Sequence, residues 1–273
     1  MEDLKALRDA IDSLDGRLLE LLNERARLAQ AIGRIKERNG RPVYAPERAE
    51  QLIRALAARS SGPLGEEAIR AIYGEVMSAS LALEKDTVIA CSGREGGPAH
   101  FAARQQFGSS VRYAFYPEAG DLFAAVASGS ADCGVIPFVS GGPDGSCAAL
   151  LARGGVFLST EVVVGTSGGN ERYFVLGTAL NSPSGDDVTA FLLEGEGLDE
   201  ESLRAGLESR GGSLLRMMPA QDAGGPVFLE VAGHAGDDSL AGLPSLLAPL
   251  GIVSRLCGSY PRHRTTVSCT DHA

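Results

Sequence analysis

The first 38 residues predict one long amphipathic helix, and this helix limits what the chain can fold into. Its apolar residues recur at the three- and four-residue steps of an α-helix. The stripe consists of Leu4, Leu7, Ile11, Leu14, Leu18, Leu21, Leu22, Leu28, Ala29, Ile32 and Ile35. A helix of this length with one apolar stripe is not stable alone, and two shorter helices cover it only in part. The sequence therefore predicts a homodimer that forms through the long helix.

Residues 1–86 together predict an all-α domain of three helices. The first helix ends before Gly40, because glycine supplies a helix stop. The second begins at Pro46, since proline is tolerated in the first turn. The third runs from about Leu64 to Lys85.

After Lys85 the chain alternates short β-type runs with helical stretches, which predicts a small α/β lobe over residues 87–180. Its expected strands are Thr87–Cys91, Val111–Tyr116, Cys133–Phe138, Val156–Val164 and Arg172–Leu176, and its helices are Ala99–Gln106, Asp121–Ser128 and Ala148–Leu151. Residues 187–262 give strand, helix, strand, strand, helix, strand, the order of a ferredoxin-like α+β unit. Its second helix is expected at Leu240–Leu247. The fold class is therefore multi-domain.

Composition excludes several classes of partner. The net charge of −10 argues against nucleic acid, because a phosphate backbone needs a basic surface. The charged start of the chain has no apolar signal region, and no run of about 18 apolar residues predicts a membrane span. The five cysteines are scattered and lack C-x-x-C spacing, which favours a reduced cytoplasm over a zinc site. We expect no metal and no cofactor.

Three cations on the long helix stand out in this acidic chain. At roughly 100° per residue, Arg25 and Lys36 point about 20° apart, whereas Arg8 lies on another side. Arg8 is also about 42 Å from Lys36 along the axis, at ~1.5 Å per residue. No small ligand reaches both from one chain, so a shared anionic site would need Arg8 of a second copy. Taken singly, each cation is better explained as part of a solvated helix face.

The neighbouring helices add further polar groups to this set. Arg48 opens the second helix and can fold back towards Lys36, while Ser80 and Glu84 lie four apart on one face of the third. Guanidinium groups of Arg8, Arg25 and Arg48 suit the two carboxylates of a small dianion. Lys36 would then remain to stabilise a developing oxyanion.

These residues resemble the AroQ class of chorismate mutases, and the resemblance covers the first 85 residues or so without gaps. It is carried by Leu7–Asp15, Leu21–Ala26, Ile32–Lys36, Pro46–Arg48 and Ser78–Glu84. The resemblance implies an intertwined helical dimer that converts chorismate to prephenate by a Claisen rearrangement. It implies Lys36, Glu84 and Arg25 as catalytic residues, and Arg8 of the neighbouring subunit, Arg25, Arg48 and Ser80 as substrate-binding residues.

The physical demands of that reaction agree with the residue types. The substrate must be held in a compact diaxial form, which is an orientation effect. Positive charge beside the ether oxygen stabilises it as the C–O bond breaks, and Lys36 would supply this charge. Glu84 would assist from the other side only if protonated, because an ionised carboxylate repels that oxygen.

One departure from the family concerns the C4 hydroxyl of chorismate. The family usually has Arg-Glu where this chain has Arg48-Ala49, and Ala45 also offers no polar group. Either Glu50 or water replaces the lost acceptor, or the substrate is altered at C4, as 4-amino-4-deoxychorismate is. The second substrate would point to an antibiotic pathway.

Residues 87–177 resemble part of a prephenate dehydratase with damaged motifs. The altered segments are Gly93–Gly97, Ile136–Ser140 and Glu171–Tyr173, where Glu171 replaces the family's threonine. A whole second lobe, expected between about Val164 and Glu171, is also missing, and with it the cleft for prephenate. We therefore expect an inactive dehydratase half.

Residues 187–262 resemble an ACT-type regulatory domain, best seen at Gly258–Pro261. The family's phenylalanine-sensing motif is altered here to Arg216–Pro219, so control by phenylalanine is not expected. A non-catalytic regulatory or interaction protein is the competing interpretation of the whole chain. The retained set of Arg8, Arg25, Lys36 and Arg48 disfavours it.

Overall fold

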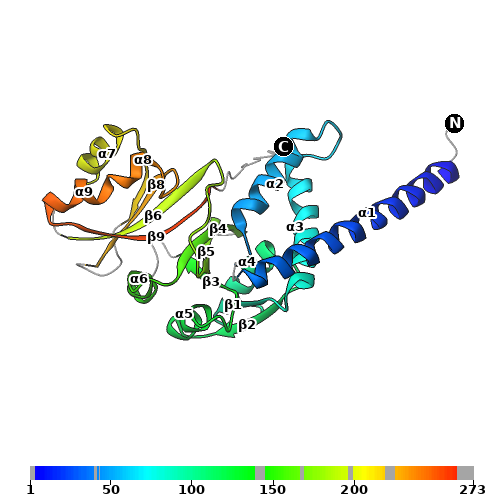
Figure 1. The fold of residues 1–273 in the computed structure, drawn as a ribbon, viewed down its shortest axis with the longest axis horizontal. Coiled ribbons are helices and arrows are strands. Elements are labelled where there is room, and N and C mark those ends of the chain that lie inside the picture. Colours follow the sequence, from blue (N-terminus) through cyan, green and yellow to red (C-terminus); the bar gives the residue numbers. More distant parts are fainter. Residues whose placement is uncertain are drawn as a thin grey trace.

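The computed structural model describes residues 4–39, 42, 44–138, 145–166, 169–195, 199–218 and 225–262. Its N-terminal part, here called the helical domain, consists of α1 (Leu4–Arg38), α2 (Pro46–Arg59) and α3 (Glu66–Glu84). Figure 1 shows α2 and α3 beside the C-terminal half of α1, while the N-terminal half of α1 extends away from the rest of the molecule. The three predicted helices are confirmed.

The apolar stripe of α1 is largely uncovered in the single chain. Within α1 the buried residues are Ala29 and Gly33, whereas Leu21 is 60% exposed and Ile35 is 57% exposed. Solvent exposure of a continuous apolar stripe of this length is unfavourable, since each fully buried leucine or isoleucine is worth about 1.5–3 kcal/mol. The stripe is thus a surface that a partner would stabilise.

The α/β lobe contains one five-stranded sheet and three helices. Its elements are β1 (Val88–Ser92), α4 (Pro98–Phe107), β2 (Arg112–Tyr116), α5 (Ala119–Ala127), β3 (Cys133–Phe138), α6 (Gly145–Ala152), β4 (Phe157–Thr166) and β5 (Gly169–Gly177). The strand order is β2-β1-β3-β5-β4. β1 is parallel to β2 and β3, whereas β4 and β5 are antiparallel neighbours separated in the chain by residues 167–168. The mixed α/β character is confirmed.

The ferredoxin-like unit contains a four-stranded antiparallel sheet. Its elements are β6 (Asp187–Glu194), α7 (Glu200–Glu208), β7 (Leu214–Met218), β8 (Val227–Ala232), α8 (Asp238–Ala241), α9 (Leu243–Leu247), the 3-10 turn Ala248–Leu250 and β9 (Val253–Pro261). The order β7-β8-β6-β9 is that of the predicted unit. The predicted helix Leu240–Leu247 is instead two short helices, because Pro244 cannot donate its backbone N–H to continue the first.

One hydrophobic core runs through both sheets. Phe138 of the lobe contacts Phe228 of β8 with ring centroids 5.5 Å apart, and Phe174 contacts Tyr260 of β9 at 5.4 Å. Gly258 lets β9 approach β4, since a Cβ at this position would overlap the backbone of Leu158. The two sheets therefore pack as one body.

The lobe also packs against the helical domain. The Tyr44 ring, which precedes α2, lies 4.8 Å from the Phe107 ring of α4, and Gln106 Nε2 donates to the Tyr44 hydroxyl at 2.8 Å. Ser110 N donates to Ser78 Oγ of α3 at 3.2 Å. These contacts join the start of α2 and the middle of α3 to the end of α4. Within the described parts of the chain, each helix is too short or too polar to cross a lipid bilayer.

Candidate active site

A cavity of about 1010 Å³ lies where the helical domain meets the other two units. All three helices line it, together with the end of α4, β4 and the end of β9. Among the predicted site residues, it is lined by Arg25, Lys36, Arg48, Ser80 and Glu84. The structure thus brings five of the six predicted residues together, from segments up to 59 positions apart in the sequence (Arg25 to Glu84).

Arg25 and Ser80 join α1 to α3 in this cavity. Arg25 Nη1 donates to Ser80 Oγ, whose own hydroxyl donates to the Val76 carbonyl oxygen at 2.8 Å. Ser80 is 7% exposed, so its hydroxyl orientation is fixed by these two partners. Arg25 keeps further N–H donors, because a guanidinium group has five. These donors are available to an anion in the cavity.

Lys36 and Glu84 form the second link between α1 and α3. Lys36 Nζ lies 3.4 Å from Glu84 Oε2, and the two side chains are 24% and 11% exposed. Gly33 makes this approach possible, since a Cβ there would lie only 2.8 Å from the Glu84 Cβ. Sequence analysis did not single out Gly33, although a glycine inside a helix signals close approach of another segment.

Arg48 reaches the cavity from the first turn of α2. Ala45 and Ala49, which are four residues apart at the start of α2, also line the cavity. The wall beside Arg48 is therefore apolar at the two positions where the sequence lacks an acceptor.

Arg8 lies apart from the other five. It is exposed on the N-terminal half of α1 and is absent from the residues that line the cavity. A single chain therefore leaves the predicted cationic set incomplete.

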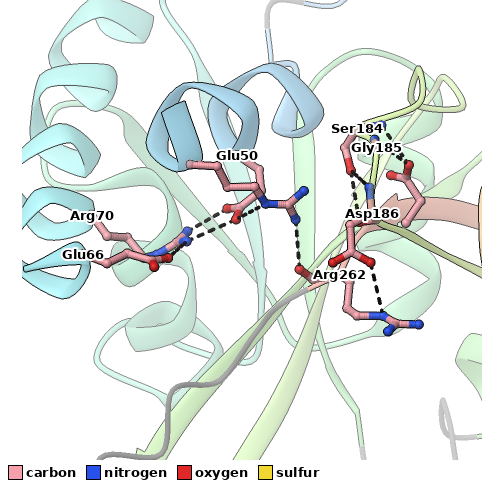
Figure 2. Close-up of polar contacts among 9 residues, drawn as sticks. Glu50, Glu66, Arg70, Ser184, Gly185, Asp186 and Arg262 are labelled. Atoms are coloured by element: carbon pink, nitrogen blue, oxygen red, sulfur yellow. Dashed lines mark hydrogen bonds and ion pairs between the residues drawn. The ribbon is translucent and has the colours of Figure 1, made fainter. Parts of the chain in front are cut away.

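Sequence analysis named Glu50 as one substitute acceptor, and the structure shows its carboxylate already occupied. Arg70 Nη1 and Nη2 donate to Glu50 at 2.7 and 3.1 Å, and Arg54 Nε donates at 3.1 Å. Figure 2 shows this cluster, with Glu66 accepting from Arg70 on its other side. The 50/54 and 66/70 pairs have i,i+4 spacing, a signal that the sequence analysis did not use.

The two glutamates at the start of α2 have opposite electrostatic environments. Burial raises the pKa of Glu47, and hydrogen bonds from its own and the Ser182 backbone N–H offset this only in part. Glu47 Oε2 is buried without a hydrogen-bond partner. Burial also acts on Glu50, but the hydrogen bonds and charge of Arg70 and then Arg54 outweigh it and lower the pKa of Glu50.

In the α/β lobe, two carboxylates contact Arg172, the arginine of the altered dehydratase segment Glu171–Tyr173. Arg172 Nε donates to Glu161 of β4, and its Nη2 lies 2.8 Å from Glu230 Oε1 of β8. Tyr260 donates to the same Glu230 oxygen at 2.6 Å. Burial opposes the charge on Arg172, but its hydrogen bond and ion pairs with Glu161 and Glu230 raise its pKa overall. Arg172 is therefore a largely covered cation, 15% exposed in its side chain, that two carboxylates neutralise between the two sheets.

The structure describes only part of the other segments that resemble dehydratase and ACT motifs. Glu171 accepts from the Tyr173 hydroxyl at 2.6 Å, so this carboxylate also has an internal partner. Residues 139–140 and Pro219, from the second dehydratase motif and the altered ACT motif, lie outside the described residues. Among those that are described, no three His, Cys, Asp or Glu side chains are grouped to hold a metal ion.

The cavity of the helical domain is lined by basic residues from all three helices, among them Arg25, Arg48 and Arg70. Residues 7–85 match the family model described as chorismate mutase type II. The N-terminal part of this chain is a chorismate mutase type II domain. The chain is also 40% identical over 141 residues to the bifunctional chorismate mutase/prephenate dehydratase of Aquifex aeolicus, which covers 50% of this chain but only 39% of that relative.

Solved structures resemble the C-terminal part in fold. A prephenate dehydratase from Arthrobacter aurescens in complex with L-Phe matches 64% of this chain and 90% of its own, with a TM-score of 0.52 and 15% identity. GqqA, described as a novel type of quorum quenching acylase, matches 64% of this chain and 95% of its own, with a TM-score of 0.51 and 21% identity. At such identities the likeness concerns fold, and the two named activities differ, so the fold does not assign an activity.

Proposed function

We propose that this protein is a chorismate mutase that converts chorismate to prephenate by a Claisen rearrangement. The observation that carries the proposal is the convergence of Arg25, Lys36, Arg48, Ser80 and Glu84 on one cavity of a chorismate mutase type II domain. Each of these residue types suits a small dianion whose ether C–O bond breaks while a C–C bond forms. No group is transferred to the protein, and no cofactor is needed.

The cavity residues divide between binding and stabilisation of charge. Arg25 and Arg48 bind the two carboxylates. The cavity walls hold the reacting ends close together, which lowers the entropic part of the barrier. Lys36 Nζ stabilises the negative charge that develops on the ether oxygen. Glu84 lies 3.4 Å from Lys36 Nζ and would add a second hydrogen bond to this oxygen only as the neutral acid.

The active unit in this proposal is a homodimer in which each cavity receives Arg8 of the partner subunit. Two observations support it: the exposed apolar stripe of α1 and the position of Arg8 outside the cavity of its own chain. An Arg8→Ala chain and a Lys36→Ala chain, each inactive alone, should complement after co-refolding. Heterodimers would contain one intact cavity, so about a quarter to a half of wild-type activity should return. Heterodimers without recovered activity would contradict a shared site.

The C-terminal half is, in this proposal, inactive as a prephenate dehydratase. Arg172 is occupied by Glu161 and Glu230, and β4 leads to β5 through two residues where the dehydratase family has a second lobe. Purified protein incubated with prephenate should yield no phenylpyruvate. Turnover comparable to the mutase rate would overturn this part.

A second candidate substrate is 4-amino-4-deoxychorismate, and the observation that favours it is the apolar wall of Ala45 and Ala49 beside Arg48. Loss of chorismate absorbance, followed side by side with the amino analogue, compares kcat/KM for the two. We expect chorismate to be preferred, and a strong preference for the amine would reverse the assignment. Turnover of neither compound would favour the non-catalytic alternative, a regulatory or interaction protein.

A further inference from the structure

Two side chains of the cavity helix α2 contact the ends of the ferredoxin-like unit: one reaches the segment just before β6, and the other reaches the residue that follows β9. Gln51 Nε2 donates to the Pro183 carbonyl oxygen at 3.3 Å, and Arg54 Nη2 donates to the Arg262 carbonyl oxygen at 3.3 Å. Both acceptors are backbone oxygens, so their positions depend on main-chain geometry. The same α2 carries Arg48, three residues before Gln51 and six before Arg54.

These two acceptors belong to a fixed piece of main chain, here called the platform (residues 183–187 and 261–262). Asp187 Oδ2 accepts from Ser184 N at 2.8 Å and from Gly185 N at 3.2 Å, which closes the turn. Arg262 N donates to the Asp186 carbonyl oxygen at 2.8 Å, and Arg262 Nε lies 3.6 Å from Asp186 Oδ1. Figure 2 shows this turn beside the Glu50 cluster of α2. The platform is therefore braced by its own hydrogen bonds and ion pair.

Arg54 connects the platform to the rest of the helical domain. Its Nε donates to Glu50, which Arg70 of α3 binds with two N–H groups. Arg54 is 29% exposed in its side chain and Glu50 17%, so solvent screens these contacts only in part. Polar side-chain contacts thus hold α2 from two sides: α3 on one and the platform on the other.

We propose that the ferredoxin-like unit positions Arg48 for substrate binding by holding α2 through Gln51 and Arg54. This inference rests on the proposed mutase function for its kinetic consequence. Gln51 and Arg54 are positioning residues, because their contacts are to the platform and to Glu50. Arg48 binds a carboxylate that is present before and during the reaction, so a misplaced α2 weakens ground state and transition state alike. The expected effect is on KM.

The test uses full-length Gln51→Ala, Arg54→Ala and the double variant, with Arg59→Ala as the control at the exposed end of the same helix. The double variant should raise KM by about 5- to 10-fold with kcat within about twofold of wild type, the pattern of lost uniform binding. Gln51→Ala should raise KM although Gln51 does not contact Glu50. This variant therefore tests the platform contact alone, whereas Arg54→Ala also removes a partner of Glu50. Arg59→Ala should leave both constants unchanged.

Hydrogen exchange in α2 gives a readout that does not depend on turnover. Amides of residues 47–59 should exchange faster in the double variant than in wild type or Arg59→Ala. An unchanged KM together with unchanged exchange would overturn the inference, as would a fall in kcat with KM unchanged. If the wild-type protein converts neither substrate, the proposed function fails. The hydrogen-exchange rates of the α2 amides still test whether Gln51 and Arg54 hold α2 on the platform. If the double variant does not fold, Gln51→Ala carries the same test.

Discussion

The helical domain and the α/β lobe each contain basic residues at predicted motif positions, yet the two regions surround these residues differently. In the helical domain, Arg25, Lys36 and Arg48 face a cavity, and Arg25 is held by a neutral hydroxyl. In the lobe, Arg172 contacts two carboxylates, and its side chain is only 15% exposed. The difference teaches that an arginine at a motif position does not by itself make a binding site. A cation binds substrate only where its neighbours leave its donors and its charge available.

The largest expected effect concerns the lobe, where Glu230 balances Arg172. Glu230→Ala should lower the free energy of unfolding by about 3–5 kcal/mol, because it leaves Arg172 buried and without one of its carboxylates. Urea unfolding followed by circular dichroism measures this. Arg216→Ala removes the exposed partner of the same carboxylate and should cost less than about 1 kcal/mol. A near-neutral Glu230→Ala would show that Arg172 does not need neutralising, and the contrast between the two regions would fail.

The next effect concerns Lys36, which lines the cavity of the helical domain and pairs with Glu84. Lys36→Ala should lower kcat at least about 100-fold, as loss of an oxyanion-stabilising donor typically does. Initial rates of chorismate loss at saturating substrate measure kcat, and melting curves report on the fold. The matched control is Arg38→Ala, which removes an exposed cation from the last turn of the same helix and should change little. Equal rates for the two variants would mean that the cavity is not the catalytic site.

A smaller effect is expected where the helical domain lacks an acceptor. Ala49→Glu should improve chorismate turnover by about 1–3 kcal/mol in kcat/KM, the value of a buried polar group regaining its partner. Ala58→Glu, on the exposed face of α2, serves as the control. A neutral result for Ala49→Glu would show that water already serves the C4 hydroxyl. Glu50 is a poor substitute because Arg70 and Arg54 occupy it.

The smallest effect concerns Glu47, where α2 meets the residues that precede β6. Because burial raises its folded-state pKa above the unfolded value, the ionised form destabilises the fold at neutral pH. Because Glu47 is only partly buried and solvent screens its charge, Glu47→Gln should stabilise the protein at pH 7 by less than about 1 kcal/mol. The advantage should shrink as the pH falls through the folded pKa and vanish below the unfolded one, where both proteins are neutral at this position. Thermal unfolding at a series of pH values measures this, and a gain that grows towards low pH would contradict it.

The secondary structure was predictable because local patterns specify it. The stripe of α1, the proline at the start of α2 and the alternation after Lys85 gave helices and strands close to those observed. The ferredoxin-like order was readable from element order alone. One error occurred at Leu240–Leu247, where the apolar spacing suggested one helix and Gly242 and Pro244 divided it. The packing of both sheets into one core was not predictable, because it depends on aromatic contacts between distant strands.

The candidate site was predictable where helical periodicity determines the direction in which a side chain points from the helix axis. Arg25 and Lys36 were assigned to one side of α1, and Ser80 and Glu84 to one side of α3, and all four line the cavity. The geometry of Arg8 also followed from the rise of a helix, which set it too far from Lys36 for one chain. Gly33, Gln51 and Arg54 were missed, since their roles depend on what packs against them.

By itself, the sequence determined the helices, the direction of their cations and the apolar stripe of α1. These follow from local periodicity, which any single chain reveals. Only the tertiary structure decided which charges are available. Arg172 and Glu230 are 58 residues apart, and Arg54 and Arg262 are 208 apart. Side-chain electrostatics depend on distance in space, so only the folded chain distinguishes the arginine held between two carboxylates in the lobe from the cations that line the cavity of the helical domain.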